Sequence, residues 1–194
     1  MNAQLKPGTA SPDAVYLRLR ARLPAGSANG EWLARLVASW CSGRGALPDF
    51  LGLEPRAFAA LLRHFFAGLV LDGRAASGRR ADFSRMLEKQ DLTDYLLRHA
   101  ARPDDPESGW IAGLLVAGCL GEDHLWQDLG LWSRSDLSGL IARNFPALAQ
   151  RNERDMKWKK FLYKQLCEAE GIYVCRAPSC DVCIDYPNCF GSED

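Results

Sequence analysis

Apolar residues recur three and four positions apart along most of this 194-residue chain, the spacing that gathers them on one face of an α-helix. The segments with this periodicity are residues 31–42, 55–69, 82–100, 106–121, 135–144 and 154–171. Convincing strand-like alternation of apolar and polar residues does not occur, and the chain contains no internal repeats. The pattern predicts an all-α fold, in which short loops join the helices of a single array.

Some helix boundaries are marked by residues with known end preferences. Pro106 suits the first turn of a helix, where its missing N–H costs nothing, and Asp105 is placed to cap the same helix. Ser135 is expected to cap a later helix, and Gly171 is expected to end the last one. The helical region therefore extends as far as Gly171.

Three parts of the chain differ in composition. Residues 1–12 contain several proline, glycine and serine residues and are expected to form a flexible lead-in. Residues 13–171 form the predicted helical domain. Residues 172–194 lose the helical periodicity, and Pro178 and Pro187 argue against a regular helix there. We expect an irregular, cysteine-rich tail that has too little apolar surface to become ordered without bound metal.

Four of the seven cysteines lie within fifteen positions of this tail. They are Cys175, Cys180, Cys183 and Cys189, with the spacing C-x4-C-x2-C-x5-C. The chain shows no apolar stretch typical of a signal peptide, and its longest apolar run is too short to span a bilayer, so we expect a cytoplasmic protein without a membrane segment. Thiols stay reduced in the cytoplasm, and an odd number of cysteines cannot all pair. The thiol cluster therefore indicates a metal site.

The cysteine spacing leaves more than one kind of site open. Soft thiolate ligands select zinc, copper(I) or iron–sulfur clusters. Structural zinc sites commonly use two separate C-x2-C pairs, whereas the tail has one, Cys180 and Cys183. The run C-x4-C-x2-C matches the start of the plant-type ferredoxin spacing and favours an iron–sulfur cluster. A zinc-stabilised helical adaptor, a ferredoxin-like electron carrier and a redox or disulfide role stay open as alternatives.

The helix before the tail carries a cationic face. Residues 151–165 hold six basic side chains against two acidic ones, and Lys157, Lys160 and Lys164 share one side of the predicted helix. Cys167 continues this stripe, which makes it a candidate additional metal ligand or a thiol that receives metal in transit, and a helix-packing thiol is an equally good interpretation. The lysine face is a candidate binding site for an oxyanion or for a partner protein, although a solvated helix surface is the simpler interpretation.

Several stretches resemble a known family. The sequence "MKWKKFLYKQLCEAEG", followed by "CRAPSCDVCIDYPNCFG", closely resembles the C-terminal signature of the NifQ family of nitrogen-fixation proteins. "HLWQDLGL", from His124 to Leu131, and "NFPALAQRN", from Asn144 to Asn152, are similar to the middle region of that family. The resemblance is strong over residues 110–191, and the four spaced cysteines show no departure from the family pattern.

The resemblance implies a function for the tail. It implies a protein that carries a molybdenum–iron–sulfur cluster and supplies molybdenum for assembly of the iron–molybdenum cofactor of nitrogenase, as a donor rather than an enzyme. The implied cofactors are an iron–sulfur cluster of the 4Fe-4S or MoFe3S4 type and molybdenum. The implied partners are the NifEN assembly scaffold, the nitrogenase iron protein and molybdate, which the lysine face would attract. The residues that match the family's cluster-binding cysteines are Cys175, Cys180, Cys183 and Cys189.

Other polar and thiol side chains are less specific. His124 and Asp128 stand four positions apart and form a candidate metal- or molybdate-binding pair, although a structural hydrogen bond behind a helix cap at Asp123 is the simpler interpretation. A net charge of zero argues against a general nucleic-acid binder, and no phosphate-binding loop or hydrolytic triad is present. Expected to be structural are His64, His99, Cys41 and Cys119.

Overall fold

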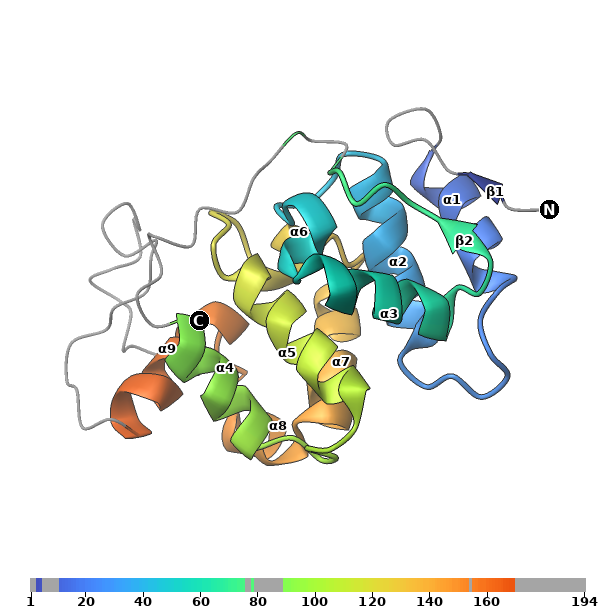
Figure 1. Ribbon diagram of the computed structural model, residues 1–194. Helices are drawn as coiled ribbons and strands as arrows, with labels where there is room; N and C mark the ends of the chain where they lie inside the picture. Colours follow the sequence, from blue (N-terminus) through green and yellow to red (C-terminus); the bar gives the residue numbers. More distant parts are fainter. Residues whose placement is uncertain (1–2, 5–10, 76–77, 79–88, 154, 170–194) are drawn as a thin grey trace.

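The computed structural model describes residues 3–4, 11–75, 78, 89–153 and 155–169, so the cysteine-rich tail lies outside the described residues. Within the described ranges the regular structure is almost entirely helical, as the periodicity predicts (Figure 1). Two short strands, β1 (Ala3–Gln4) and β2 (Leu69–Val70), pair in parallel. The helices are α1 (Pro12–Arg20), α2 (Gly30–Cys41), the 3₁₀ helix η1 (Asp49–Gly52), α3 (Pro55–Phe65), α4 (Lys89–Arg98), α5 (Pro106–Gly118), α6 (Leu125–Asp128), α7 (Arg134–Asn144), α8 (Pro146–Arg151) and α9 (Trp158–Ala169).

The middle of the helical array is occupied by α5, which contacts α3, α4, α6 and η1 (Figure 1). Its side chains Ile111, Leu114 and Leu115 are fully buried. A helix that is apolar on every side must be enclosed by other elements, and this explains why the most apolar stretch of the chain forms the core. Asp105 caps the helix as predicted, because its Oδ1 accepts the backbone N–H of Glu107 at 3.0 Å. No helix in the described part of the chain, α5 included, has the length and apolarity needed to cross a membrane.

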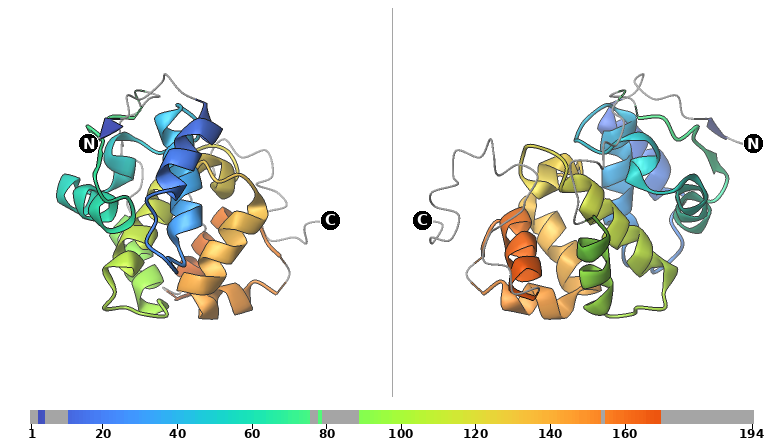
Figure 2. Two further views of the ribbon diagram at one scale, coloured as in Figure 1. Left: turned by 90° about the vertical axis from the view of Figure 1, so that its right-hand side faces the viewer. Right: turned by 60° about the vertical axis from the view of Figure 1, so that its left-hand side comes forward.

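The other helices lie on opposite sides of α5. In Figure 1, α2 and α3 lie to its right and α4 and α9 lie to its left. Helix α1 packs on α2, α4 contacts both α5 and α9, and α7 contacts α8. Figure 2 shows α9 beside α4 in a second view. The helix that precedes the cysteine-rich tail is therefore a packed part of the array.

The start of α7 differs from the sequence prediction. The capping residue is Ser133 rather than Ser135, because the Oγ of Ser133 accepts the backbone N–H of Asp136 at 3.1 Å. Ser135 lies within the first turn of the helix. Both residues are good caps by type, so residue type does not distinguish them, and the hydrogen bond to Asp136 does.

A buried polar cluster joins α2, α5 and α7. Asn29 donates from Nδ2 to Oδ1 of Asn144 at 3.0 Å, and Asn144 donates from Nδ2 to Oδ1 of Asn29 at 2.9 Å. Asn29 also donates to Glu107 at 2.7 Å, and Asn144 also donates to the carbonyl oxygen of Leu140 at 2.8 Å. Buried polar groups that are paired in this way favour one arrangement of the helices over alternatives.

Candidate metal-handling site

The four predicted cluster ligands, Cys175, Cys180, Cys183 and Cys189, lie outside the described residues, and their prediction is not tested by the structure. What the structure does place is α9, the helix that precedes them in the sequence. The predicted lysine face and Cys167 belong to this helix and to the residue before it. Within the described residues, the candidate site therefore consists of α9 and its surroundings.

One side of α9 is packed into the helical array. The buried residues predicted for this side are Trp158, Phe161, Leu162 and Leu166. The indole N–H of Trp158 also donates to Oγ of Ser138 in α7 at 3.0 Å. Ala169, which the periodicity also places on the apolar stripe, is instead exposed. Because the packed residues extend over most of α9, the helix has a fixed orientation relative to α4 and α7.

A buried ion pair adds a second attachment. Nζ of Lys159 pairs with Oδ2 of Asp128, the last residue of α6, and also donates to the carbonyl oxygen of Gly121 at 2.8 Å. The side chains of Lys159 and Asp128 are 15% and 4% exposed, respectively. A side chain at Gly121 would collide with the Asp128 carboxylate, so glycine is required for this close approach. Lys159 therefore fixes α9 to α6 and to the segment that joins α5 and α6.

The burial of this pair has an electrostatic cost. Burial raises the pKa of Asp128, and the charge and hydrogen bond of Lys159 lower it, with a net increase above the ordinary value. The thiol of Cys119 lies within the field of both groups, and burial raises its pKa to about 12. Burial likewise raises the pKa of Cys41 to about 12. Both thiols are therefore protonated at neutral pH, and thiolates are the form that binds metal, which agrees with their predicted structural role.

The predicted lysine face is less exposed than a free surface helix. Lys157 precedes α9, and its carbonyl oxygen accepts the N–H of Phe161 at 2.9 Å, so it stands at the start of the helix. Lys160, Lys164 and Cys167 are partly buried. Nζ of Lys164 lies 3.8 Å from Oε1 of Glu168, one turn later. The face is thus held in position by α9, and part of its positive charge is compensated locally.

The structure does not bring His124 and Asp128 together as a site. His124 is exposed and occupies the N-cap position of α6 that the sequence analysis gave to Asp123, while Asp128 is buried against Lys159. His64 pairs with Glu107, with Nε2 2.9 Å from Oε1. In the described residues, no group of three or more histidine, cysteine, aspartate and glutamate side chains is arranged to hold a metal ion.

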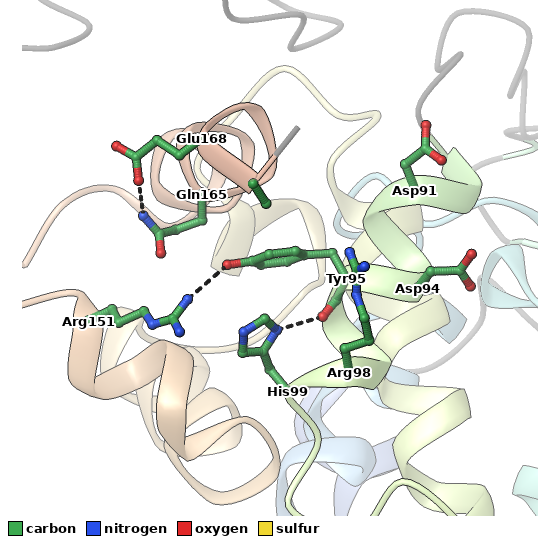
Figure 3. Close-up of a pocket in the computed structure, with 9 residues that line it drawn as sticks. Asp91, Asp94, Tyr95, Arg98, His99, Arg151, Gln165 and Glu168 are labelled. Carbon is green, nitrogen blue, oxygen red and sulfur yellow. Dashed lines mark hydrogen bonds between the residues drawn. The ribbon is translucent and has the colours of Figure 1, made fainter. Parts of the chain in front are cut away.

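A polar surface cavity of about 750 Å³, which the sequence did not predict, lies between α4 and the C-terminal ends of α8 and α9 (Figure 3). Tyr95, which is 2% exposed, lies at its centre, and its hydroxyl oxygen accepts Nη1 of Arg151 at 3.3 Å. The rings of Tyr95 and His99 lie 4.5 Å apart between centroids, and the guanidinium carbon of Arg98 lies 5.8 Å from the Tyr95 ring centre. The remaining lining residues are Asp91, Asp94, Gln165, Glu168 and Ala169.

Comparison with known proteins places the chain in a family. A family model described as NifQ matches residues 32–191, which is most of the chain. The chain belongs to the NifQ family. Protein NifQ of Azotobacter vinelandii is 46% identical over 176 residues, covering 86% of this chain and 90% of the relative. Protein NifQ of Klebsiella pneumoniae is 38% identical over 168 residues, covering 82% and 97%. Protein NifQ of Rhodobacter capsulatus is 37% identical over 164 residues, covering 84% and 88%. No solved structure matches the chain.

Family membership confirms the resemblance seen in the sequence and places the chain among proteins of nitrogen fixation. The matched range ends at residue 191, two positions after Cys189, so the family region includes all four spaced cysteines. It also includes α9, the Lys159–Asp128 pair and the residues of the cavity. The tail, the helix that precedes it and the cavity are therefore parts of one family region.

Proposed function

We propose that this chain binds an iron–sulfur or molybdenum–iron–sulfur cluster and supplies molybdenum for assembly of the nitrogenase iron–molybdenum cofactor. The observation that carries the proposal is that the NifQ family region extends through four cysteines spaced C-x4-C-x2-C-x5-C. The proposed ligands are Cys175, Cys180, Cys183 and Cys189. The protein acts as a carrier rather than as an enzyme, and its place of action is the cytoplasm.

The donor set fits such a cluster chemically. Four thiolates are the usual ligands of an iron–sulfur cluster, and soft sulfur ligands also suit molybdenum held within a sulfide cluster. The thiols of Cys41 and Cys119, with pKa values raised to about 12, are poor competitors for the metal. When bound, the cluster supplies a sulfide environment in which molybdenum can be held for transfer.

The described residues contribute a rigid support for the tail. The apolar packing of α9 and the ion pair between Lys159 and Asp128 fix the helix that leads into the cysteine segment. A fixed helix presents its side chains to a recipient protein in one orientation. These side chains lose little further conformational freedom on binding, which favours one direction of approach. The proposed recipients are the NifEN scaffold and the nitrogenase iron protein, and the face formed by Lys157, Lys160 and Lys164 is a proposed contact for them.

Metal content of cysteine variants tests the proposed ligands. Cys180→Ser and Cys183→Ser should each remove most of the iron from anaerobically purified protein, because the C-x2-C pair holds two ligands in a fixed register. Cys41→Ser and Cys119→Ser serve as matched controls and should leave the iron content unchanged, because those thiols are buried in the helical core. Iron and sulfide are measured per chain in each preparation. Equal loss of iron from both groups of variants would show that the ligands are misassigned.

A further inference from the structure

The outward side of α1 carries a second apolar face. Val15 and Leu19 of this helix are buried in the core. Ala14, Leu17 and Ala21 lie on the opposite side and are exposed, and Leu17 keeps 60% of its surface exposed. These three residues, the outer stripe, stand three and four positions apart, the spacing of an apolar seam along a helix. A single exposed leucine is ordinary, but here it occupies the middle of a seam.

Charged residues flank the outer stripe along one edge. Asp13 and Arg20 are exposed and stand seven positions apart, so they lie on the same side of the helix. The Asp13 carboxylate has no ion-pair partner among the described residues. Arg20 pairs with Glu31 through Nε, at 3.0 Å from Oε1, and its side chain is still 59% exposed. This edge therefore carries negative charge where α1 begins and positive charge where it ends.

An edge of this kind is complementary to a second copy of itself. In two antiparallel helices related by a two-fold axis at Leu17, a residue before Leu17 lies opposite one that follows Leu17 by the same number of positions. Asp13 stands four positions before Leu17 and Arg20 three after, so Asp13 of one copy lies within one residue, ~1.5 Å along the helix, of Arg20 of the other. Parallel helices would instead place like charges together. The charges on α1 thus favour antiparallel pairing.

Two neighbouring residues affect such a pair in opposite ways. Tyr16 lies on the same side of α1 as Arg20, four positions before it, and the Trp132 ring packs on Tyr16 with 4.9 Å between ring centroids. Trp132 is 40% exposed and adds apolar surface beside the outer stripe. Arg18 is exposed on the other edge, where two copies would bring two guanidinium groups near each other. This repulsion limits the strength of the pair.

We propose that α1 is a contact surface for a second copy of this chain, which pairs antiparallel through the outer stripe and through two ion pairs between Asp13 and Arg20. One helix of nine residues gives a small interface, and small interfaces are typical of weak association. In Figure 1, α1 lies on the other side of the array from α9, so this pairing leaves the lysine face uncovered. The contact does not depend on the proposed function of the tail, because α1 precedes the matched family range.

Sedimentation velocity of the full-length protein, under anaerobic and reducing conditions and at increasing concentration, tests this contact. We expect a reversible equilibrium between monomer and dimer that shifts to monomer on dilution. Leu17→Glu should weaken the association at least tenfold, because it places two carboxylates together at the two-fold axis. Val70→Glu is the matched control, because Val70 is an exposed aliphatic residue of β2, outside α1, and the substitution adds the same charge. It should leave the association unchanged, and circular dichroism should show equal helix content in both variants.

Charge reversal tests the antiparallel arrangement. Asp13→Arg and Arg20→Glu should each weaken self-association, because like charges then meet across the contact. The two variants mixed in equal amounts should associate at least tenfold more tightly than either does alone, because opposite charges meet at both ends, and added salt should reduce this gain. Protein that stays monomeric at every concentration, or a dimer that Val70→Glu weakens as much as Leu17→Glu does, would overturn the contact. A mixture that associates no better than the separate variants would overturn the antiparallel pairing.

Discussion

Removal of Lys159 should destabilise the protein because it leaves the Asp128 carboxylate buried without its charged partner. The side chain of Asp128 is 4% exposed, and that of Lys159 is 15% exposed, so solvent screens this pair only weakly. Loss of one partner of a buried pair costs about 3–5 kcal/mol. Since Lys159 retains some contact with solvent, we expect Lys159→Met to lower the free energy of unfolding by about 3 kcal/mol, near the lower end of that range.

Urea unfolding, followed by tryptophan fluorescence and far-ultraviolet circular dichroism, measures this loss. Lys164→Met is the matched control, because Lys164 lies on the same helix, is 34% exposed and pairs with Glu168 at a distance of 3.8 Å. A surface pair of this kind contributes about 0.3–0.5 kcal/mol. An Asp128→Leu, Lys159→Met double variant should recover most of the stability, because replacement of both charges by apolar groups removes the cost of their burial.

The effect of Lys159→Met should depend on pH. The pKa of Asp128 is raised in the folded protein, so protonation of Asp128 favours folding, and this contribution is lost as pH rises through the folded pKa. Without Lys159, which lowers the pKa, the folded pKa of Asp128 rises further. The stability deficit should therefore be small near the ordinary aspartate pKa of 3.8 and larger at neutral pH. A loss no greater than that of the Lys164 variant, or a deficit that does not change with pH, would refute this reasoning.

Two further predictions concern the Asn29–Asn144 cluster and the lysine face. Asn144→Ala should lower the free energy of unfolding by about 2–3 kcal/mol, because the buried Asn29 side chain then loses the acceptor of its Nδ2 and the donor to its Oδ1. A loss below about 0.5 kcal/mol in urea unfolding would show that the cluster contributes little. Lys160→Gln combined with Lys164→Gln should keep the iron content of the isolated protein, and should reduce molybdenum transfer to a recipient protein in a salt-dependent way. Unchanged transfer, or loss of iron in that variant, would contradict a role of the lysine face as a contact for the recipient.

The helical fold could be predicted from the sequence because periodicity and helix-end residues are local signals. The apolar stretch of α5 and its cap at Asp105 follow from residue type and spacing alone. The N-cap of α7 could not be decided in the same way, because Ser133 and Ser135 are equally suitable by type. Local signals therefore gave the helices and left some of their boundaries open.

The features around α9 depend on contacts between distant parts of the chain. Lys159 stands between Trp158 and Lys160 in a run of basic residues, and its partner Asp128 lies 31 positions earlier. In the cavity, Tyr95 belongs to α4 and His99 follows the end of that helix four positions later, but Arg151 is 56 positions from Tyr95. Spacing along one helix could have suggested the first pair of residues, whereas only the packing of α4, α8 and α9 brings the arginine to them. The four tail cysteines were found from spacing because they are close together in the sequence.

Elemental analysis of the full-length protein, purified without oxygen after growth with molybdate, is the most direct test of the central claim. Iron, molybdenum, sulfide and zinc are measured per chain in one preparation. A brown protein with several iron and sulfide per chain, accompanied by molybdenum, is the predicted result. A colourless protein with about one zinc per chain and no iron or molybdenum would contradict the account and identify the tail as a structural zinc site.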